Sequence, residues 1–150
     1  MNKLELTKED HELVAAAAES IRKPVLQIFG EKAPALVGAA LRLDNGRIIT
    51  SNNLTVDVGS ISMCAEPFAI AEANRDPDRK ITTIVAVYHE LTKDPKVISP
   101  CGRCREAITD FAAAGFVILR DPGTKELYKV RSVDLLPLKY GDYWKDGNLV

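Results

Sequence analysis

The 150-residue sequence lacks the features that mark several classes of protein. Residues 1–12 alternate charged and polar side chains without the apolar core of a signal peptide, and no run approaches the roughly 18 apolar residues of a membrane-spanning helix. The 20 basic and 21 acidic residues are well mixed, so no basic field is available to hold a nucleic acid backbone. We therefore expect a cytoplasmic protein that binds neither membranes nor nucleic acids.

Cysteine is scarce, and internal repeats and low-complexity tracts are absent. Three cysteines in a chain without a secretion signal are not expected to form structural disulfides in a reducing compartment, which favours a metal or a reactive thiol. The composition, 46% hydrophobic and 27% charged, is that of an ordinary globular protein, and the length suits one domain. We expect a single domain over residues 1–150.

The hydrophobic pattern predicts helices that alternate with strands. Thr7 and Asp10 resemble a capping box, and Asp44-Asn45-Gly46 is typical of a hairpin turn. Residues 81–88 (ITTIVAVY) are almost continuously apolar, as a central strand covered on both faces would be. This order predicts a three-layer α/β/α domain. The predicted elements are a helix from Thr7 towards Pro24, hairpin strands in 33–43 and 47–50, a helix over 64–75, a strand over 81–88, a helix from Cys101, and strands over 116–119 and 127–130.

Two short motifs open the second and third predicted helices. They are Cys64-Ala65-Glu66 and Pro100-Cys101-Gly102-Arg103-Cys104. The two cysteines of the second motif are three residues apart and therefore lie on one helix face, where they can share one ion. Zinc binds thiolates readily; a structural site is closed by four protein ligands, whereas a catalytic site keeps one position for water. With only three cysteines, the catalytic type of site is favoured.

The remaining candidate groups support this interpretation. His11 and His89 stand at no short ligand spacing from a cysteine, so neither is expected to be the fourth ligand. Glu66 follows Cys64 by two residues and does not face the same way on a helix, so it is placed to act on a zinc-bound water as a general acid and base. Two other interpretations of the cysteine motifs stay open. One is a redox dithiol, which would not require Cys64 or Glu66, and the other is a purely structural zinc site.

These motifs resemble the signature of the cytidine deaminase superfamily, which is [CH]-A-E followed by P-C-x-x-C. Zinc deaminases that act on nucleobases have a version of the same signature. A Val37-Gly38-Ala39-Ala40-Leu41 strand precedes them, and the resemblance covers nearly the whole chain. It implies a five-stranded mixed sheet with helices on both faces, one zinc per subunit held by Cys64, Cys101 and Cys104, and a homotetramer. It also implies that Glu66 moves protons from the attacking water to N3 and to the leaving amine, while C4 of a cytosine ring is attacked and ammonia is released.

Within the superfamily, this sequence is closest in pattern to the blasticidin S deaminases. Cytidine deaminases usually have an arginine after the signature glutamate, where this chain has Pro67. Arg103, between the two cysteines, is then the candidate for balancing the charge of three thiolates, and the C-G-R-C-R pattern also occurs in blasticidin S deaminases. The usual N-x-E motif for the ribose reads Asn53-Leu54-Thr55, and Ala35 replaces a common phenylalanine, which puts plain cytidine in doubt.

The C-terminal sequence points the same way. Leu135-Leu136-Pro137 followed by Tyr140 and Trp144 resembles the end of blasticidin S deaminases, with different spacing. The expected function is therefore deamination of a blasticidin S-like or modified cytosine nucleoside. The alternatives are an ordinary cytidine or deoxycytidine deaminase of pyrimidine salvage, a polynucleotide deaminase, and a non-enzymatic zinc or redox thiol module. The substrate contacts expected from the resemblance are Asn53, Ala65, Ser99, Tyr140 and Trp144.

Overall fold

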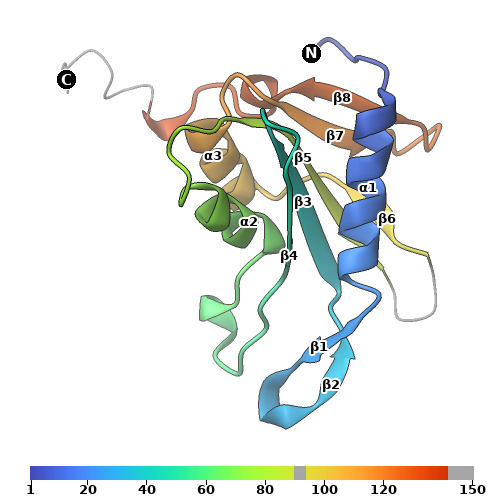
Figure 1. Ribbon diagram of the computed structural model, residues 1–150, viewed down its shortest axis with the longest axis vertical. Helices are drawn as coiled ribbons and strands as arrows, with labels where there is room; N and C mark the ends of the chain where they lie inside the picture. The colour runs from blue at the N-terminus through green and yellow to red at the C-terminus, as the bar shows by residue number, and fades with distance from the viewer. Residues whose placement is uncertain (90–93, 142–150) are drawn as a thin grey trace.

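Helices cover both faces of one mixed sheet in the computed structural model, which describes residues 1–89 and 94–141 (Figure 1). Helix α1 (Lys8–Ser20) lies on one face, and α2 (Ala65–Ala73) and α3 (Gly102–Phe111) lie side by side on the other. The predicted three-layer α/β/α arrangement is confirmed. No helix within the described residues is both long enough and apolar enough to cross a bilayer.

The main sheet has the strand order β4-β3-β5-β7-β8. The pairing of β5 with β7 is parallel and the other pairings are antiparallel. The predicted ITTIVAVY strand is β5, and it is central as expected. A short sixth strand, β6, pairs with the last part of β5 and was not predicted. The strands are β3 (Val37–Leu43), β4 (Ile48–Asn52), β5 (Ile81–Tyr88), β6 (Lys96–Ile98), β7 (Phe116–Arg120) and β8 (Leu127–Arg131).

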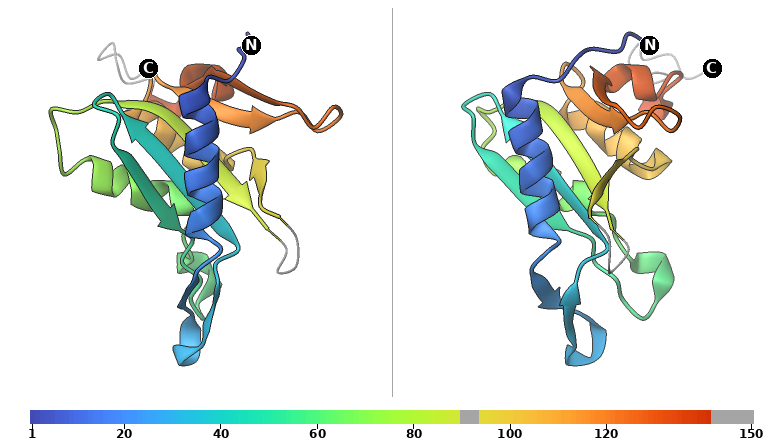
Figure 2. Two further views of the ribbon diagram at one scale, coloured as in Figure 1. Left: turned by 45° about the vertical axis from the view of Figure 1, so that its right-hand side comes forward. Right: turned by 90° about the vertical axis from the view of Figure 1, so that its right-hand side faces the viewer.

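A separate two-stranded hairpin follows α1 and projects from the body of the protein (Figure 2). It consists of β1 (Pro24–Leu26) and β2 (Lys32–Pro34), joined by the 3₁₀ turn η1 (Ile28–Gly30). The sequence analysis did not predict this hairpin. Two further 3₁₀ turns are η2 (Gly59–Ile61), ahead of α2, and η3 (Ser132–Leu135), after β8.

Local sequence signals account for the best-defined element boundaries. The Thr7 hydroxyl accepts from the Asp10 N–H, and the Asp10 carboxylate accepts from the Thr7 N–H, so the predicted capping box begins α1. Gly46 has φ of 85° in the turn between β3 and β4, a conformation that favours glycine. Both boundaries therefore lie where the sequence predicted them.

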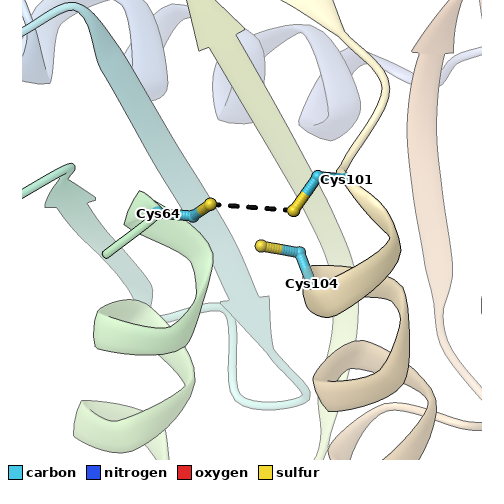
Figure 3. A group of neighbouring side chains, drawn as sticks. All are labelled: Cys64, Cys101 and Cys104. Atoms are coloured by element: carbon cyan, nitrogen blue, oxygen red, sulfur yellow. Dashed lines mark hydrogen bonds between the residues drawn. The ribbon is translucent and has the colours of Figure 1, made fainter. Parts of the chain in front are cut away.

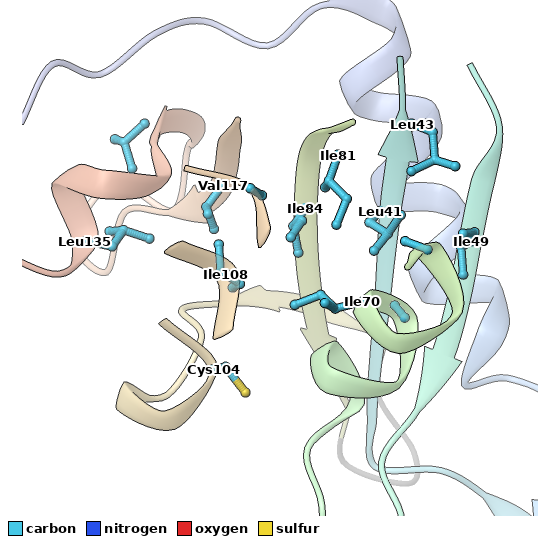
Figure 4. Packing of buried hydrophobic residues seen from close by; sticks show 14 of the residues in the cluster. Leu41, Leu43, Ile49, Ile70, Ile81, Ile84, Cys104, Ile108, Val117 and Leu135 are labelled. Atoms are coloured by element: carbon cyan, nitrogen blue, oxygen red, sulfur yellow. The ribbon is translucent and has the colours of Figure 1, made fainter. Parts of the chain in front are cut away.

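The core is divided by the sheet into two clusters. On the side of α2 and α3, Leu41 and Ile84 pack with Cys104 and Ile108 (Figure 4). On the side of α1, the next residue of β5, Val85, packs in the other cluster. Successive β5 residues are thus buried on opposite faces, which explains the unbroken apolar run. The helix that bears Cys104 rests directly on the core.

Candidate active site

Three thiols from two helix starts converge on the face of the sheet covered by α2 and α3 (Figure 3). The Sγ atoms of Cys64, Cys101 and Cys104 all lie within 4.8 Å of one another, and those of Cys64 and Cys101 are 3.7 Å apart. That distance is far beyond a disulfide bond of about 2.05 Å. It matches the roughly 3.8 Å between two sulfurs on one tetrahedral zinc with Zn–S bonds of about 2.3 Å. The donor set therefore fits zinc.

The local fold explains why these thiols point at one place. Cys64 is the N-cap of α2 and Cys101 is the N-cap of α3, and neither side chain makes a capping hydrogen bond. Cys104 projects from the first turn of α3. The N-terminus of a helix carries unpaired N–H groups and a partial positive charge, which favour thiolate over thiol. Two helix N-termini thus face the cluster.

The electrostatics of the thiols depend on their burial. Burial raises the pKa of Cys64 and, still more strongly, that of Cys104, where the nearby Glu66 carboxylate adds to the effect. Burial also acts on Cys101, but the Cys104 N–H and the neighbouring thiols outweigh it and hold the Cys101 pKa below its ordinary value. A metal ion has to displace protons from the raised thiols, so zinc affinity at this cluster is expected to fall with falling pH.

Glu66 lies in the first turn of α2 and is 3% exposed. Its Oε2 atom is buried and has no hydrogen-bond partner among the described residues. Burying a carboxylate without a partner is costly, and such groups in native proteins call for an explanation in terms of function or a missing ligand. Glu66 lines the same cavity as Cys64 and Cys101, so its unpartnered oxygen is available to a molecule bound there.

The cavity beside the thiols has a volume of about 300 Å³, at the lower end of the range for small-molecule sites. Among the described lining residues, Glu66 is the only acidic residue, and there is no lysine, arginine or histidine. The lining residues are Val37, Asn53, Leu54, Thr55, Ser62, Met63, Cys64, Glu66, Ile98, Ser99 and Cys101.

One wall of the cavity is held by Asn53. Its Oδ1 accepts from the Val37 N–H at 2.9 Å, and its Nδ2 donates to the Thr55 hydroxyl at 3.1 Å. The Asn53 N–H also donates to the Val37 carbonyl at 2.9 Å. These bonds fix the amide orientation, so the second N–H of Nδ2 is directed by the fold rather than free to rotate.

Two positioning contacts were missed by the sequence analysis. The Arg105 guanidinium donates to the Pro100 carbonyl and to the Ser99 hydroxyl, both at 3.0 Å, and braces the loop that leads into Cys101. The Ser51 hydroxyl, on β4, donates to the Ala65 carbonyl at 2.7 Å and ties the first turn of α2 to the sheet. The arginine after the second cysteine was visible in the sequence, but nothing there indicated its partners.

Several of the predicted site residues lie apart from the cavity lining. Ala65 is buried at the start of α2, and the side chain of Arg103 is exposed on α3 without a hydrogen bond or ion pair to any described residue. The side chain of Tyr140 is 70% exposed and does not line the cavity; its N–H donates to Glu106 Oε1 at 3.4 Å. Trp144 lies outside the described residues. Asn53 and Ser99 do line the cavity, but the substrate-contact roles of all five residues, these two with Ala65, Tyr140 and Trp144, stay predictions.

The histidines and Ala35 have other places in the fold. Within residues 1–89 and 94–141, the group that could hold a metal ion contains only the three cysteines. His11 is exposed on α1, and His89 is buried with its Nε2 2.9 Å from the Ala35 carbonyl. Ala35 belongs to the core cluster on the α1 side and does not line the cavity.

Comparisons with known proteins identify a consistent set of relatives. The family model described as the cytidine and deoxycytidylate deaminase zinc-binding region matches residues 8–120. A blasticidin-S deaminase of Bacillus cereus is 36% identical over 144 residues, which cover 93% of this chain and 98% of that protein. A cytidine deaminase of Halalkalibacterium halodurans is 28% identical over 101 residues, covering 67% of this chain and 74% of that protein.

Solved structures agree with the fold. The crystal structure of the cytidine deaminase from Bacillus anthracis aligns with a TM-score of 0.73 at 22% identity, covering 94% of this chain and 95% of that chain. The cytidine deaminase from Burkholderia pseudomallei aligns with a TM-score of 0.68 at 24% identity, covering 90% of this chain and 100% of that chain. At these identities the likeness concerns the fold alone.

Proposed function

The chain belongs to the cytidine and deoxycytidylate deaminase zinc-binding family and is a zinc-dependent hydrolytic deaminase. On this basis we propose that its substrate is a cytosine nucleoside or a cytosine-containing analogue of the blasticidin S type. The observation that carries this proposal is the buried Oε2 of Glu66, which has no partner among the described residues and lines the same cavity as the thiols. A carboxylate in that position is suited to moving protons on a bound molecule.

In the proposed reaction, Cys64, Cys101 and Cys104 hold one zinc ion. When bound, zinc supplies Lewis-acid chemistry, because it lowers the pKa of a coordinated water towards about 7. Glu66 accepts one proton of the attacking water on its free oxygen and delivers it to the ring nitrogen as the water oxygen bonds to the amino-bearing carbon. It then accepts the second proton from the added hydroxyl and delivers it to the amino group, which leaves as ammonia when the C–N bond breaks. Its burial keeps bulk water from competing for those protons.

The charge of the site needs compensation by nearby groups. Three thiolates on one zinc leave a net negative charge, and Pro67 occupies the position that follows the glutamate. We propose that the N-termini of α2 and α3, together with Arg103 between the two cysteines of α3, balance this charge. The Arg103 side chain is exposed and has no other described partner, so it is able to turn towards the ligands.

The lining of the cavity supports a nucleoside rather than a nucleotide. A phosphate group is normally held by arginine, lysine or backbone N–H groups, and no cationic side chain is among the described lining residues. On the wall expected to meet the sugar, Asn53 and Thr55 offer an amide and a hydroxyl but no carboxylate. A neutral Thr55 does not repel an acidic group on the sugar, which supports an analogue with an altered sugar over plain cytidine. An ordinary cytidine or deoxycytidine deaminase is the second candidate, supported by the cytidine deaminase relatives.

Replacement of the proposed proton carrier tests the reaction. In Glu66→Gln, zinc content is expected to stay at one per chain while the rate of ammonia release falls by about 10²- to 10⁴-fold, because the amide cannot accept and return a proton. Glu72→Gln, on the same helix but with its side chain half exposed, is the matched control and is expected to leave the rate unchanged. A non-enzymatic zinc or thiol module predicts no ammonia release from either protein. Purified protein without stoichiometric zinc would contradict the proposal.

A substrate panel tests the specificity. Ammonia release is measured with cytidine, deoxycytidine, cytosine, cytidine monophosphate and blasticidin S as substrates at equal concentrations. The proposal expects the nucleoside analogue with the altered sugar to give the highest kcat/KM, and the nucleotide to be a poor substrate. Ordinary efficiency on cytidine alone would show that Thr55 does not set the specificity. Sedimentation of the zinc-loaded protein tests the expected homotetramer in the same preparation.

A further inference from the structure

The central strand changes its neighbour along its length. Thr83 and Ile84 of β5 pair with β7, whereas the later residues from Ala86 to Tyr88 pair with β6. A second cavity, of about 520 Å³, opens between β6 and β7 and reaches Arg120 at the carboxyl end of β7. In open α/β sheets, ligands bind outside the carboxyl ends of strands at the point where the strand connections diverge. The crevice lies at the carboxyl end of β7, beside the parallel pairing of β5 with β7, and shares that feature with such sites.

Positive charge gathers around this crevice. Arg105, Arg120 and Lys125 line it, and no carboxylate is among its described lining residues. Asp121, which follows Arg120 in the sequence, accepts from Lys3 at 2.7 Å and from the N–H groups of the following turn. Its carboxylate is therefore held by these groups rather than by Arg120 or Lys125.

The two arginines of the crevice lack anionic partners among the described residues. The guanidinium of Arg105 donates only to neutral acceptors, the Ser99 hydroxyl and the carbonyls of Pro100 and Leu135. The side chain of Arg120 is half-buried and makes no hydrogen bond or ion pair with any described residue. A planar guanidinium matches the oxygens of a phosphate or carboxylate, and such charge-assisted bonds are about twice as strong as neutral ones.

The crevice shares a wall with the substrate cavity. Ile98 and Ser99 line both, and the Ser99 hydroxyl accepts from Arg105 at 3.0 Å. Pro100, the residue before Cys101, is held by the same guanidinium. An anion in the crevice would compete with these neutral acceptors for Arg105 and so alter the loop that carries Ser99 and leads into Cys101. Leu119, Tyr128 and Leu135 form an apolar part of the wall, which can contact the carbon atoms of an organic anion.

We propose that the crevice between β6 and β7 is a second ligand site, for a small organic dianion that bears a phosphate group or two carboxylate groups, and that its occupancy is communicated to the substrate cavity through Arg105 and Ser99. The site is separate from the thiol cluster, and its described lining offers an anion cationic side chains that the described lining of the substrate cavity does not.

Calorimetric titration of the intact zinc-loaded protein at constant ionic strength tests the binding. The probes are glycerol 2-phosphate and succinate, which separate the phosphate from the carboxylate source, with glycerol as the uncharged control. We expect saturable binding of at least one anion and none of glycerol. In Arg120→Gln the affinity is expected to fall at least about tenfold, whereas Arg131→Gln, an exposed arginine outside the crevice, leaves it unchanged. No saturable binding up to about 10 mM, or equal weakening by both variants, would overturn the site.

The communication to the substrate cavity rests on the proposed deamination and is tested separately. At a saturating concentration of the bound anion, the KM or kcat for ammonia release is expected to change at least about twofold in the wild type. Arg120→Gln is expected to keep the basal rate and lose this response. Binding without any kinetic change would overturn the coupling. If no substrate is deaminated at all, the proposed function fails while the binding titration still decides on the site.

Discussion

Replacing Gly38 by alanine tests how closely α1 packs on the sheet. Gly38 lies in β3 beneath the last turn of α1, where an added Cβ would come within 2.6 Å of the Ile21 Cγ2 and the Ser20 Oγ and within 2.9 Å of the Ala17 carbonyl oxygen. A Cβ atom is essentially never found within 3.0 Å of such neighbours, so either these atoms or the backbone of Gly38 would have to move. The Ser20 hydroxyl can rotate away, but Ile21 is fully buried and the Ala17 oxygen belongs to the helix backbone.

The magnitude follows from the balance of two effects. Overpacking in a closed core costs about 1–3 kcal/mol, and the fixed contacts place Gly38→Ala towards the upper end. Replacing glycine by alanine also lowers the entropy of the unfolded chain, which offsets about 0.4–1 kcal/mol. We expect a net loss of about 2 kcal/mol in the free energy of unfolding. For a chain of this length that corresponds to a fall of about 4–8 °C in Tm.

The assay is urea unfolding of the zinc-loaded variants at equal zinc saturation, because a bound ion adds its own stabilisation to the folded state. Gly59→Ala is the matched control, since no heavy atom lies within 4 Å of its added Cβ, and its effect should stay within about 0.5 kcal/mol. In an Ile21→Ala background, Gly38→Ala should cost less than it does alone. Equal stability of Gly38→Ala and wild type would refute the close approach of α1.

Two further predictions concern charge and positioning. Asp10 is buried, but its bonds from Lys129 and Thr7 outweigh that burial and hold its pKa below the ordinary value. Its stabilising effect is therefore present above about pH 3.8 and lost as the pH falls through the lowered pKa, so Asp10→Asn should flatten the acid side of a Tm-against-pH curve. Ser51→Ala removes the bond to the Ala65 carbonyl, and we expect about 1 kcal/mol lower stability, unchanged zinc content and a lower kcat, measured by unfolding, metal analysis and ammonia release.

The parts of the fold that the sequence predicted are those governed by local chemistry. The capping box at Thr7, the turn at Gly46 and the two-sided apolar run of β5 each depend on residues close together in the chain. The thiol cluster was predictable for a different reason. Each cysteine motif stands at the start of a helix, and the alternation of helices and strands brings the two helix starts to one face of the sheet.

The elements that were missed are stabilised by non-local contacts or are too short to show a period. Strand β6 has three residues and follows a proline, and it is a strand only because the end of β5 offers an unpaired edge. The β1–β2 hairpin has three-residue strands whose side chains are exposed or half-buried, so no alternation of apolar and polar residues marks it. Arg105 acts through backbone carbonyls, which leave no signature in the sequence.

The candidate site departs from the rules that the rest of the fold obeys. α1 begins with a threonine that caps it, whereas α2 and α3 begin with cysteines that cap nothing. An N-cap without a side-chain bond costs about 1 kcal/mol, and an unpartnered buried carboxylate at Glu66 costs more. Features that lower the folding stability in this way are expected at functional sites, where the same residues are needed for catalysis or binding. Because Cys104 packs into the core beside Ile108, the core cluster on the side of α2 and α3 positions one of the three thiols directly.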